Sequence, residues 1–322
     1  MEATSPPLVA NSIEKWFERR SYDCSQFADL GQLGRRKAEL GLSLSVVLPA
    51  REVAGTVGTI VDQVLALERQ ELVDQLLVVD ADSADGSAEI AARHGAEVFQ
   101  ESDLLPQFGP VLGKGDAMWR ALSVARGDIV VYLDADTTDF GAHFVYGLLG
   151  PLLHDPRLSF VKAAYSRPTR DGATVEMEGS GRVTELTARP LFNLFYPELT
   201  GFVQPLAGEL AARRELLSSI PFFTGYAVET GMLIDVLEAA GLDAMAQVDL
   251  GRRTNRNQGL FALSRMSYEV LRAIEIRLRG DGRLFETGVG DGYVQAIRSS
   301  GSLNLDRTDV KVVERPPLAE LS

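Results

Sequence analysis

Two aspartates, Asp134 and Asp136, follow directly on an apolar run in the stretch IVVYLDADTTDF at residues 129–140. Residues i and i+2 of an extended chain point to the same side, with Cα atoms about 6.5 Å apart. Two ionised carboxylates that face one site repel each other, by on the order of 4 kcal/mol at an effective dielectric constant near 20. The pair therefore predicts a positive partner. A divalent cation with a bound diphosphate is the simplest partner, because Mg²⁺ and Mn²⁺ take oxygen ligands.

Short β-branched runs alternate with helix-like stretches along the first half of the chain. The runs are SLSVVLPA (43–50), QLLVVDAD (75–82), AEVFQ (96–100), DIVVYLDAD (128–136) and LSFVKAA (158–164). The helix-like stretches cover residues 56–69, 86–94, 113–125 and 140–153. This alternation predicts an α/β fold with a doubly wound, mostly parallel sheet.

Three of the predicted strands end in segments that could line a site. These segments are Pro49-Ala50-Arg51, Asp80-Ala81-Asp82 and Asp134-Ala135-Asp136. Ligands of such sheets bind beyond the carboxyl ends of the strands, so we expect the three segments to converge on one crevice. A lone pair of aspartates is more often a solvated turn, but this position favours a binding site.

The composition excludes several classes of protein. The chain has 322 residues, a net charge of -13 and a single cysteine, Cys24. The negative charge argues against a nucleic-acid surface, and one cysteine permits neither an intrachain disulfide nor a cysteine metal cluster. There is no apolar run long enough to span a membrane and no signal-peptide pattern at the N-terminus. We therefore expect a soluble, cytoplasmic protein.

The flanking segments have a different character. Residues 11–40 are typical of one or two amphipathic helices, and residues 261–300 of a mainly helical segment. Either segment could pack on the core or build a homodimer. Residues 166–182 are rich in Gly, Arg and Thr, and we interpret them as a mobile loop that could act as a lid. The apolar positions of the first segment are Trp16, Phe17, Phe27 and Leu30.

Eight motifs together carry a family resemblance. VVLPAREVAGTVGTIV, VVDADSADGS, GKGDAMWRAL and GDIVVYLDAD resemble the nucleotide-sugar-binding half of a GT-A glycosyltransferase. GSGRVTELTARPLFNLFYPEL, VQPLAGE, GYAVETG and LGRRTNRNQ resemble the retaining glucosyl- and mannosyl-3-phosphoglycerate synthases. The resemblance implies a GT-A fold with flanking helical segments. The implied parts are an N-terminal arm (1–42), a catalytic domain (43–260, with a nucleotide-sugar half 43–165 and an acceptor half 166–260), and a C-terminal helical segment and tail (261–322).

The resemblance implies a donor site on the first half of the chain. Lys114, in the GKG motif, would contact the donor diphosphate, next to a helix N-terminus that favours anions. A P-loop is excluded, because its first glycine would be one residue too close and Gly115 replaces the required Ser or Thr. Ala81 and Val53 stand where relatives often have Ser and Glu. The implied donor-binding residues are Pro49, Ala50, Arg51, Asp80, Asp82, Lys114, Asp134 and Leu206.

The implied metal site is built on the two aspartates. Asp136 would be a direct ligand of Mg²⁺ or Mn²⁺, with Asp134 near the metal or on the ribose. Relatives commonly add a histidine, and Asn255 stands at its position here. An amide oxygen carries no charge, so we expect weaker or less selective metal binding.

The acceptor implied by the resemblance, 3-phosphoglycerate, carries a phosphate and a carboxylate. Its partners would be Gly181, Arg182 and Thr184 on one side, and Arg253 and Asn257 on the other. The implied catalytic residues are Glu229, Lys114 and Asp136. Glu229 would hold sugar or acceptor hydroxyls and stabilise positive charge at the anomeric carbon.

The function implied is metal-dependent, retaining transfer of mannose or glucose from a GDP- or UDP-linked donor to 3-phosphoglycerate. The product would be a precursor of a compatible solute. Two alternatives stay open at this point: a polyprenyl-phosphate glycosyltransferase, and a non-catalytic nucleotide-sugar-binding scaffold.

Overall fold

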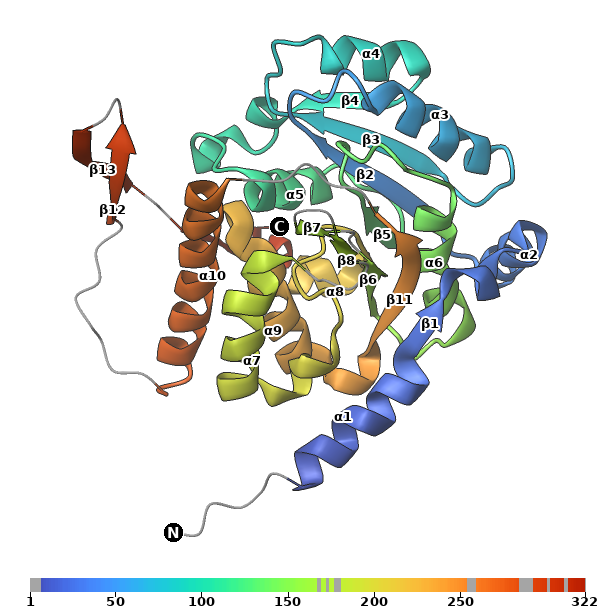
Figure 1. The fold of residues 1–322 in the computed structure, drawn as a ribbon. Helices are drawn as coiled ribbons and strands as arrows, with labels where there is room; N and C mark the ends of the chain where they lie inside the picture. The colour runs from blue at the N-terminus through green and yellow to red at the C-terminus, as the bar shows by residue number, and fades with distance from the viewer. Residues whose placement is uncertain are drawn as a thin grey trace.

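An eight-stranded sheet forms the centre of the molecule (Figure 1). The computed structural model describes residues 7–166, 169–171, 174–176, 181–253, 259–283, 292–299, 302–309 and 312–321. Neighbouring strands are parallel except where β9 lies antiparallel between β5 and β6. In spatial order the strands are β1 (Ser21–Asp23), β11 (Met245–Arg252), β6 (Phe160–Ser166), β9 (Leu210–Arg213), β5 (Ile129–Tyr132), β2 (Leu44–Ala50), β3 (Gln75–Asp80) and β4 (Glu97–Gln100).

The predicted first half of the fold is confirmed. The five predicted strands are β2 to β6, and the four predicted helices are α3 (Val57–Glu68), α4 (Ser87–His94), α5 (Lys114–Leu122) and α6 (His143–His154). The inner strands of this half are continuous apolar runs because helices cover both faces of the sheet. Along β5, Ile129 and Val131 pack on one face, and Val130 and Tyr132 on the other.

Two layers of helices enclose the sheet (Figure 1). Buried residues of α2 (Leu30–Leu40), α3 and α6 share one core cluster with the sheet. Buried residues of α5, α7 (Arg189–Phe195), α9 (Val228–Ala240) and α10 (Leu260–Gly280) share the other. The remaining shorter helices are α8 (Arg214–Ser219), η1 (Cys24–Phe27), η2 (Glu101–Asp103), η3 (Pro106–Phe108), η4 (Thr184–Ala188), η5 (Pro197–Gly201), η6 (Gly225–Ala227), η7 (Leu242–Ala244) and η8 (Leu318–Leu321).

The N-terminal arm packs on the core of the sheet. Helix α1 (Pro7–Arg20) buries Trp16, whose Nε1 donates to the carbonyl of Met245 at 2.9 Å and whose ring lies 4.7 Å from that of Phe202. Phe27 is also buried, whereas Phe17 is 43% exposed. The prediction of helices over residues 11–40 is right for α1 and α2. It missed β1, which extends the sheet beside β11.

Two predictions for the later segments need correction. Residues 261–300 are helical only as far as Gly280, because β12 (Gly292–Ser299) pairs antiparallel with β13 (Ser302–Asp309). Within 166–182, β7 (Thr169–Asp171) and β8 (Thr174–Glu176) form a strand pair rather than an irregular loop. A last strand, β14 (Glu314–Arg315), pairs with β10 (Phe222–Phe223).

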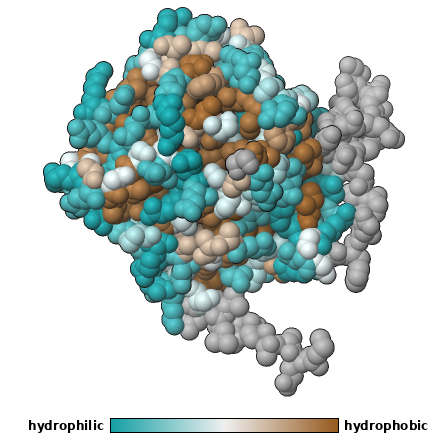
Figure 2. Space-filling view, turned by 180° about the vertical axis from the view of Figure 1, so that it is seen from behind, coloured by the Kyte–Doolittle hydropathy of each residue, from teal (hydrophilic) through white to brown (hydrophobic). Residues whose placement is uncertain are grey.

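The surface mixes polar and apolar side chains. Figure 2 shows hydrophilic residues over much of one face, with hydrophobic residues between them. Among the residues that the structure describes, no helix combines the length and the apolar character that a membrane crossing requires.

The anchoring of the N-terminal arm through Trp16 leads to a stability prediction. The substitution Trp16→Ala removes a side chain that is 1% exposed and leaves a cavity against the sheet. We expect the free energy of unfolding to fall by about 3–5 kcal/mol. Chemical denaturation measures this change. The matched control is Phe17→Ala on the exposed side of the same helix, where a change within about 0.5 kcal/mol is expected; equal effects would contradict the anchoring.

Candidate active site

The three predicted strand ends lie side by side at the carboxyl edge of the sheet. Ala50 is in register with Asp80, and the Ala81 amide donates to the carbonyl of Ala50 at 2.9 Å. The Thr56 hydroxyl donates to the carbonyl of Ala135 at 2.6 Å, which ties the loop after β2 to the two aspartates. The predicted convergence of these segments is therefore observed.

Lys114 forms the centre of the site. It is the first residue of α5, and its Nζ lies 2.5 Å from Oδ1 of Asp134 and 3.1 Å from Oε1 of Glu229. Glu229 lies in the first turn of α9, about 115 residues after Lys114 in the sequence. The tertiary fold therefore brings the two side chains together. The structure thus joins three of the predicted site residues, and one ammonium group bridges two carboxylates.

The charges of this trio are mutually stabilised. Burial alone would lower the pKa of Lys114, but the neighbouring Asp134 and Glu229 outweigh it and raise the pKa above its ordinary value. Burial would likewise raise the pKa of Asp134, yet Lys114 and Arg253 hold it well below its usual range. Both groups therefore stay ionised across the physiological pH range.

Two glycines allow the approach of these groups. A Cβ atom on Gly208 would lie 2.2 Å from Nζ of Lys114 and 2.4 Å from Oδ1 of Asp134. A Cβ atom on Gly115 would lie 2.0 Å from the carbonyl oxygen of Phe223, which precedes the helix that carries Glu229. A side chain at position 208 would displace the charged ends of Lys114 and Asp134, and one at position 115 would push the backbone of Phe223 away from α5.

Arg253 binds the aspartates from the other side. Its guanidinium donates to Oδ2 of Asp134 at 2.9 Å and to the Tyr165 hydroxyl at 2.8 Å, and it forms an ion pair with Glu209. A further oxygen, Oδ1 of Asp136, lies 3.6 Å away. Arg253 is 1% exposed, and burial raises the pKa of Glu209 despite this pairing. The structure therefore places Arg253, which the resemblance assigned to the acceptor, against Asp134 and close to Asp136.

Asp136 suits the role of metal ligand. Its side chain is 58% exposed, whereas both oxygens of Asp134 accept hydrogen bonds from Lys114 and Arg253. A carboxylate oxygen is the donor that Mg²⁺ and Mn²⁺ prefer. No group of three His, Cys, Asp or Glu residues suited to a metal occurs in the described part of the chain. The predicted ligand Asn255, like Asn257, lies outside the described residues.

The residues predicted to line the nucleoside pocket differ in burial. Asp80 is 1% exposed; its Oδ2 accepts from the Ser83 amide at 2.9 Å, and its Oδ1 has no hydrogen-bond partner among the described residues. Arg51 and Asp82 are exposed. Pro49 is half-buried and Ala50 is buried.

Glu101 is a nearby carboxylate that sequence reasoning missed. It follows β4 directly, one residue beyond the pairing of Gln100 with Asp80, and it is 6% exposed. Burial, with the neighbouring charges of Asp116 and Asp80, raises the pKa of Glu101 to about 8. The available signal was the position of Glu101 directly after the predicted strand AEVFQ, since three other predicted strand ends already pointed to the site.

Lys162 is a second residue that sequence reasoning missed. It lies in the middle of β6, is fully buried, and its Nζ has no hydrogen-bond partner among the described residues. Burial lowers the pKa of Lys162 to about 8; the charge of Lys114 adds to this, while Glu229 opposes it. The signal was a lysine inside the apolar run LSFVKAA, which a strand buried on both faces does not tolerate without a reason.

The predicted acceptor and sugar residues occupy separate segments. Gly181 has a φ of +101°, Arg182 is exposed and Thr184 is buried at the start of η4. η4 is tied to α10 by the hydrogen bond from the Thr187 hydroxyl to Ser267, at 3.1 Å. Leu206 is half-buried, two residues before Gly208. Their ligand contacts remain predictions.

Known proteins resemble this chain over most of its length. The model of glycosyl transferase family 2 matches residues 45–208. The glucosyl-3-phosphoglycerate synthase of Petrotoga mobilis is 40% identical over 93% of both chains, and that of Mycobacterium tuberculosis H37Rv is 40% identical over 90% of this chain and 88% of its own.

Solved structures of the same two kinds of enzyme also resemble this chain. The mannosyl-3-phosphoglycerate synthase of Rubrobacter xylanophilus is 57% identical and superposes with a TM-score of 0.89 over 96% of this chain and 98% of its own. The Mycobacterium tuberculosis glucosyl-3-phosphoglycerate synthase in complex with Mn²⁺, UDP and glucosyl-3-phosphoglycerate is 39% identical, with a TM-score of 0.78 over 91% of this chain and 96% of its own.

The burial of Lys162 leads to a prediction about pH and stability. Because its pKa falls from 10.5 to about 8 on folding, the unfolded chain binds more protons between these values, and stability rises with pH through this window. Below pH 8 the folded protein carries the full cost of a buried ammonium. We expect Lys162→Met to raise the free energy of unfolding at pH 7 by on the order of 3 kcal/mol, with the gain shrinking towards pH 10.

Denaturant titrations at several pH values measure this effect, with Lys37→Met as the matched control. Lys37 is 5% exposed, but its Nζ pairs with Asp74 at 2.6 Å and donates to the carbonyl of Glu71 at 2.8 Å. Its replacement should lower stability, because those partners lose their cation. A Lys162→Met variant that is less stable than the parent at pH 7 would show that the lysine is not a cost to the fold.

Proposed function

Because the chain belongs to glycosyl transferase family 2, and within it to the glucosyl- and mannosyl-3-phosphoglycerate synthases, we propose that it is a hexosyltransferase. The proposed reaction transfers a hexosyl group from a nucleoside-diphosphate sugar to 3-phosphoglycerate with retention of configuration. The observation that carries the proposal is the position of Lys114 between Asp134 and Glu229. The Lys114 ammonium lies next to Asp134, which we assign to the metal and diphosphate, and next to Glu229, which we assign to the sugar.

Lys114 is the group that would contact the donor diphosphate. When the glycosidic bond breaks, negative charge develops on the leaving phosphate oxygen, and a fixed ammonium in a partly buried site stabilises that charge. The raised pKa of Lys114 keeps it protonated for this task. Asp134 fixes its direction through a 2.5 Å hydrogen bond, so little reorganisation is needed during the reaction.

A divalent cation, Mg²⁺ or Mn²⁺, is the cofactor of this family fold, and Asp136 is the described residue that would hold it. When bound, such a cation neutralises charge on the diphosphate and orients it. Arg253 and Glu209, beneath Asp134, would keep the aspartates in place by balancing their charge.

Glu229 would act on the sugar side. Its side chain is 6% exposed and its Oε1 lies 3.1 Å from Lys114, so its second oxygen can accept from a sugar or acceptor hydroxyl. A carboxylate there also stabilises the positive charge that develops at the anomeric carbon. Retention would follow from a front-face route, in which the leaving phosphate oxygen accepts the proton of the acceptor hydroxyl.

Arg182 would bind the acceptor. An exposed guanidinium forms paired hydrogen bonds with phosphate or carboxylate groups, and 3-phosphoglycerate offers both. The positive φ of Gly181, +101°, lets the chain turn just before it. The positive charge of Arg182 would let a protein with a net charge of -13 bind an anionic acceptor.

The hexose that we propose is mannose. The mannosyl-3-phosphoglycerate synthase is 57% identical to this chain, against about 40% for the glucosyl enzymes. The product would be mannosyl-3-phosphoglycerate, a precursor of a compatible solute. Identity alone does not fix the base of the donor, so GDP- and UDP-linked sugars both enter the test.

The defining experiment measures release of nucleoside diphosphate by the purified protein with Mg²⁺ or Mn²⁺. GDP-mannose, UDP-mannose, GDP-glucose and UDP-glucose are each supplied with and without 3-phosphoglycerate. We expect rapid release only when 3-phosphoglycerate is present, with GDP- or UDP-mannose preferred over glucose donors. Asp136→Asn is the inactive control. Binding without turnover would indicate a scaffold, and turnover that ignores 3-phosphoglycerate would indicate another acceptor, such as a polyprenyl phosphate.

The acceptor role of Arg182 gives a second prediction. Arg182→Ala should raise the KM for 3-phosphoglycerate by roughly tenfold to a hundredfold, because a charged hydrogen-bond pair is lost, and should leave the donor KM within about twofold. Arg126→Ala, which removes an exposed arginine that pairs with Glu97, is the control and should change neither value. Equal effects of Arg182→Ala on both substrates would contradict the assignment.

A further inference from the structure

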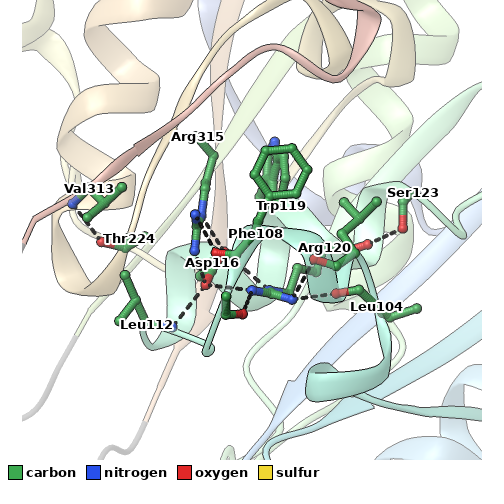
Figure 3. Close-up of polar contacts among 12 residues, drawn as sticks. Leu104, Phe108, Leu112, Asp116, Trp119, Arg120, Ser123, Thr224, Val313 and Arg315 are labelled. Atoms are coloured by element: carbon green, nitrogen blue, oxygen red, sulfur yellow. Dashed lines mark hydrogen bonds and ion pairs between the residues drawn. The ribbon is translucent and has the colours of Figure 1, made fainter. Parts of the chain in front are cut away.

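The C-terminal strand β14 lies between α5, which begins at Lys114, and β10, which precedes the helix that carries Glu229. Figure 3 shows the contacts of Arg315 with Asp116 and of Val313 with Thr224. β14 pairs with β10, and the Val313 amide donates to the Thr224 hydroxyl at 3.0 Å while the Thr224 amide donates to the Val313 carbonyl at 3.0 Å. On the other side, Nε1 of Trp119 in α5 donates to the carbonyl of Pro316 at 2.9 Å. β14 is therefore attached to both walls of the site.

Arg315 of β14 holds a buried carboxylate in α5. Its Nε and Nη2 bind the two oxygens of Asp116 at 2.9 and 3.0 Å, and its Nη1 donates to the carbonyl of Phe108 at 3.0 Å. Asp116 is fully buried and Arg315 is 6% exposed. The planar fork of a guanidinium fits this bidentate geometry, which the single ammonium of a lysine does not reproduce.

Asp116 in turn holds the loop that precedes Lys114. Its Oδ2 accepts from the Leu112 amide at 2.9 Å, two residues before Lys114. The carbonyl of the same Leu112 accepts from the Gly225 amide at 2.9 Å, four residues before Glu229. Leu112 thus lies between the Arg315–Asp116 pair and the segment that leads to Glu229.

Arg120 braces Asp116 from within α5. Its Nε lies 3.4 Å from Oδ1 of Asp116, and its Nη2 donates to the carbonyl of Gly109 at 2.7 Å. Two guanidiniums therefore face one carboxylate, and both also bind the loop between β4 and α5. A buried ion pair is weak evidence for stability, because desolvation offsets the attraction, but its fixed geometry can specify a position.

We propose that Arg315 is a positioning residue of the donor site: through Asp116 and Leu112 it sets the place of the Lys114 ammonium relative to Glu229. The inference rests on the proposed function for the identity of the ligand, a nucleoside diphosphate. It makes the C-terminal segment, which lies outside the match to the family model at residues 45–208, a required part of the site.

The test compares Arg315→Gln with Arg20→Gln. Arg20 is a matched control: it is 7% exposed, pairs with Asp155 at 2.6 Å, and precedes β1 at the far edge of the sheet. Calorimetry with Mn²⁺ and either GDP or UDP reports the dissociation constant. Loss of one positioned, charge-assisted contact to the diphosphate should raise it at least about tenfold in Arg315→Gln and leave it within about twofold in Arg20→Gln.

Both variants should lose thermal stability, so a fall in Tm alone does not decide the question. Arg315→Gln that is folded and binds the nucleotide like the parent would overturn the proposal. If that variant does not fold, Arg315→Lys keeps the charge without the fork, and parent-like binding by it would also overturn the proposal. Because nucleotide binding needs no acceptor, this result is independent of whether 3-phosphoglycerate proves to be the substrate.

Discussion

The ion pairs of Lys114 with Asp134 and Glu229 are the interaction on which the site depends. The carboxyl edge of the sheet gathers several carboxylates in a partly buried space, where unpaired charges would be costly. Lys114 and Arg253 occupy the two sides of Asp134 and balance this charge. The same arrangement leaves Asp136 more exposed than Asp134, in the position from which it can bind a cation.

The fold brings these groups together from distant parts of the sequence. α5 supplies the lysine, β5 leads into the aspartates, and α9 supplies the glutamate. The antiparallel strand β9, inserted between β5 and β6, begins directly after Gly208 and Glu209, so it sets the backbone of Gly208 against the lysine. The C-terminal strand β14 connects the remaining walls. The contacts around the site therefore come from segments spread along the described part of the chain, from β2 to β14.

The sequence predicted the parts of this arrangement that have a local signature. Alternating apolar runs and helical stretches located β2 to β6 and the helices between them, and strand-end logic placed Asp134 and Asp136 at the site. Strands β1, β9, β10 and β14 were not predicted, because their two to four residues do not lie in a longer β-branched run and pair only through tertiary contacts. Lys162 and Glu101 carried only a positional signal, a lysine inside a predicted strand and a glutamate just beyond one, and their burial follows from tertiary packing. The resemblance assigned Arg253 to the acceptor, and its packing against Glu209 is likewise a tertiary contact that no motif specifies.

The central claim is that the Lys114 ammonium stabilises the departing diphosphate. The most direct measurement is the kcat of hexosyl transfer by Lys114→Met at saturating metal, donor and 3-phosphoglycerate, beside the unfolding midpoint of the same variant. Loss of a preorganised cation at the developing charge predicts a fall in kcat of at least about a hundredfold in a folded protein. A folded Lys114→Met variant with a kcat within about threefold of the parent would contradict the account, because the site would then work without its central charge.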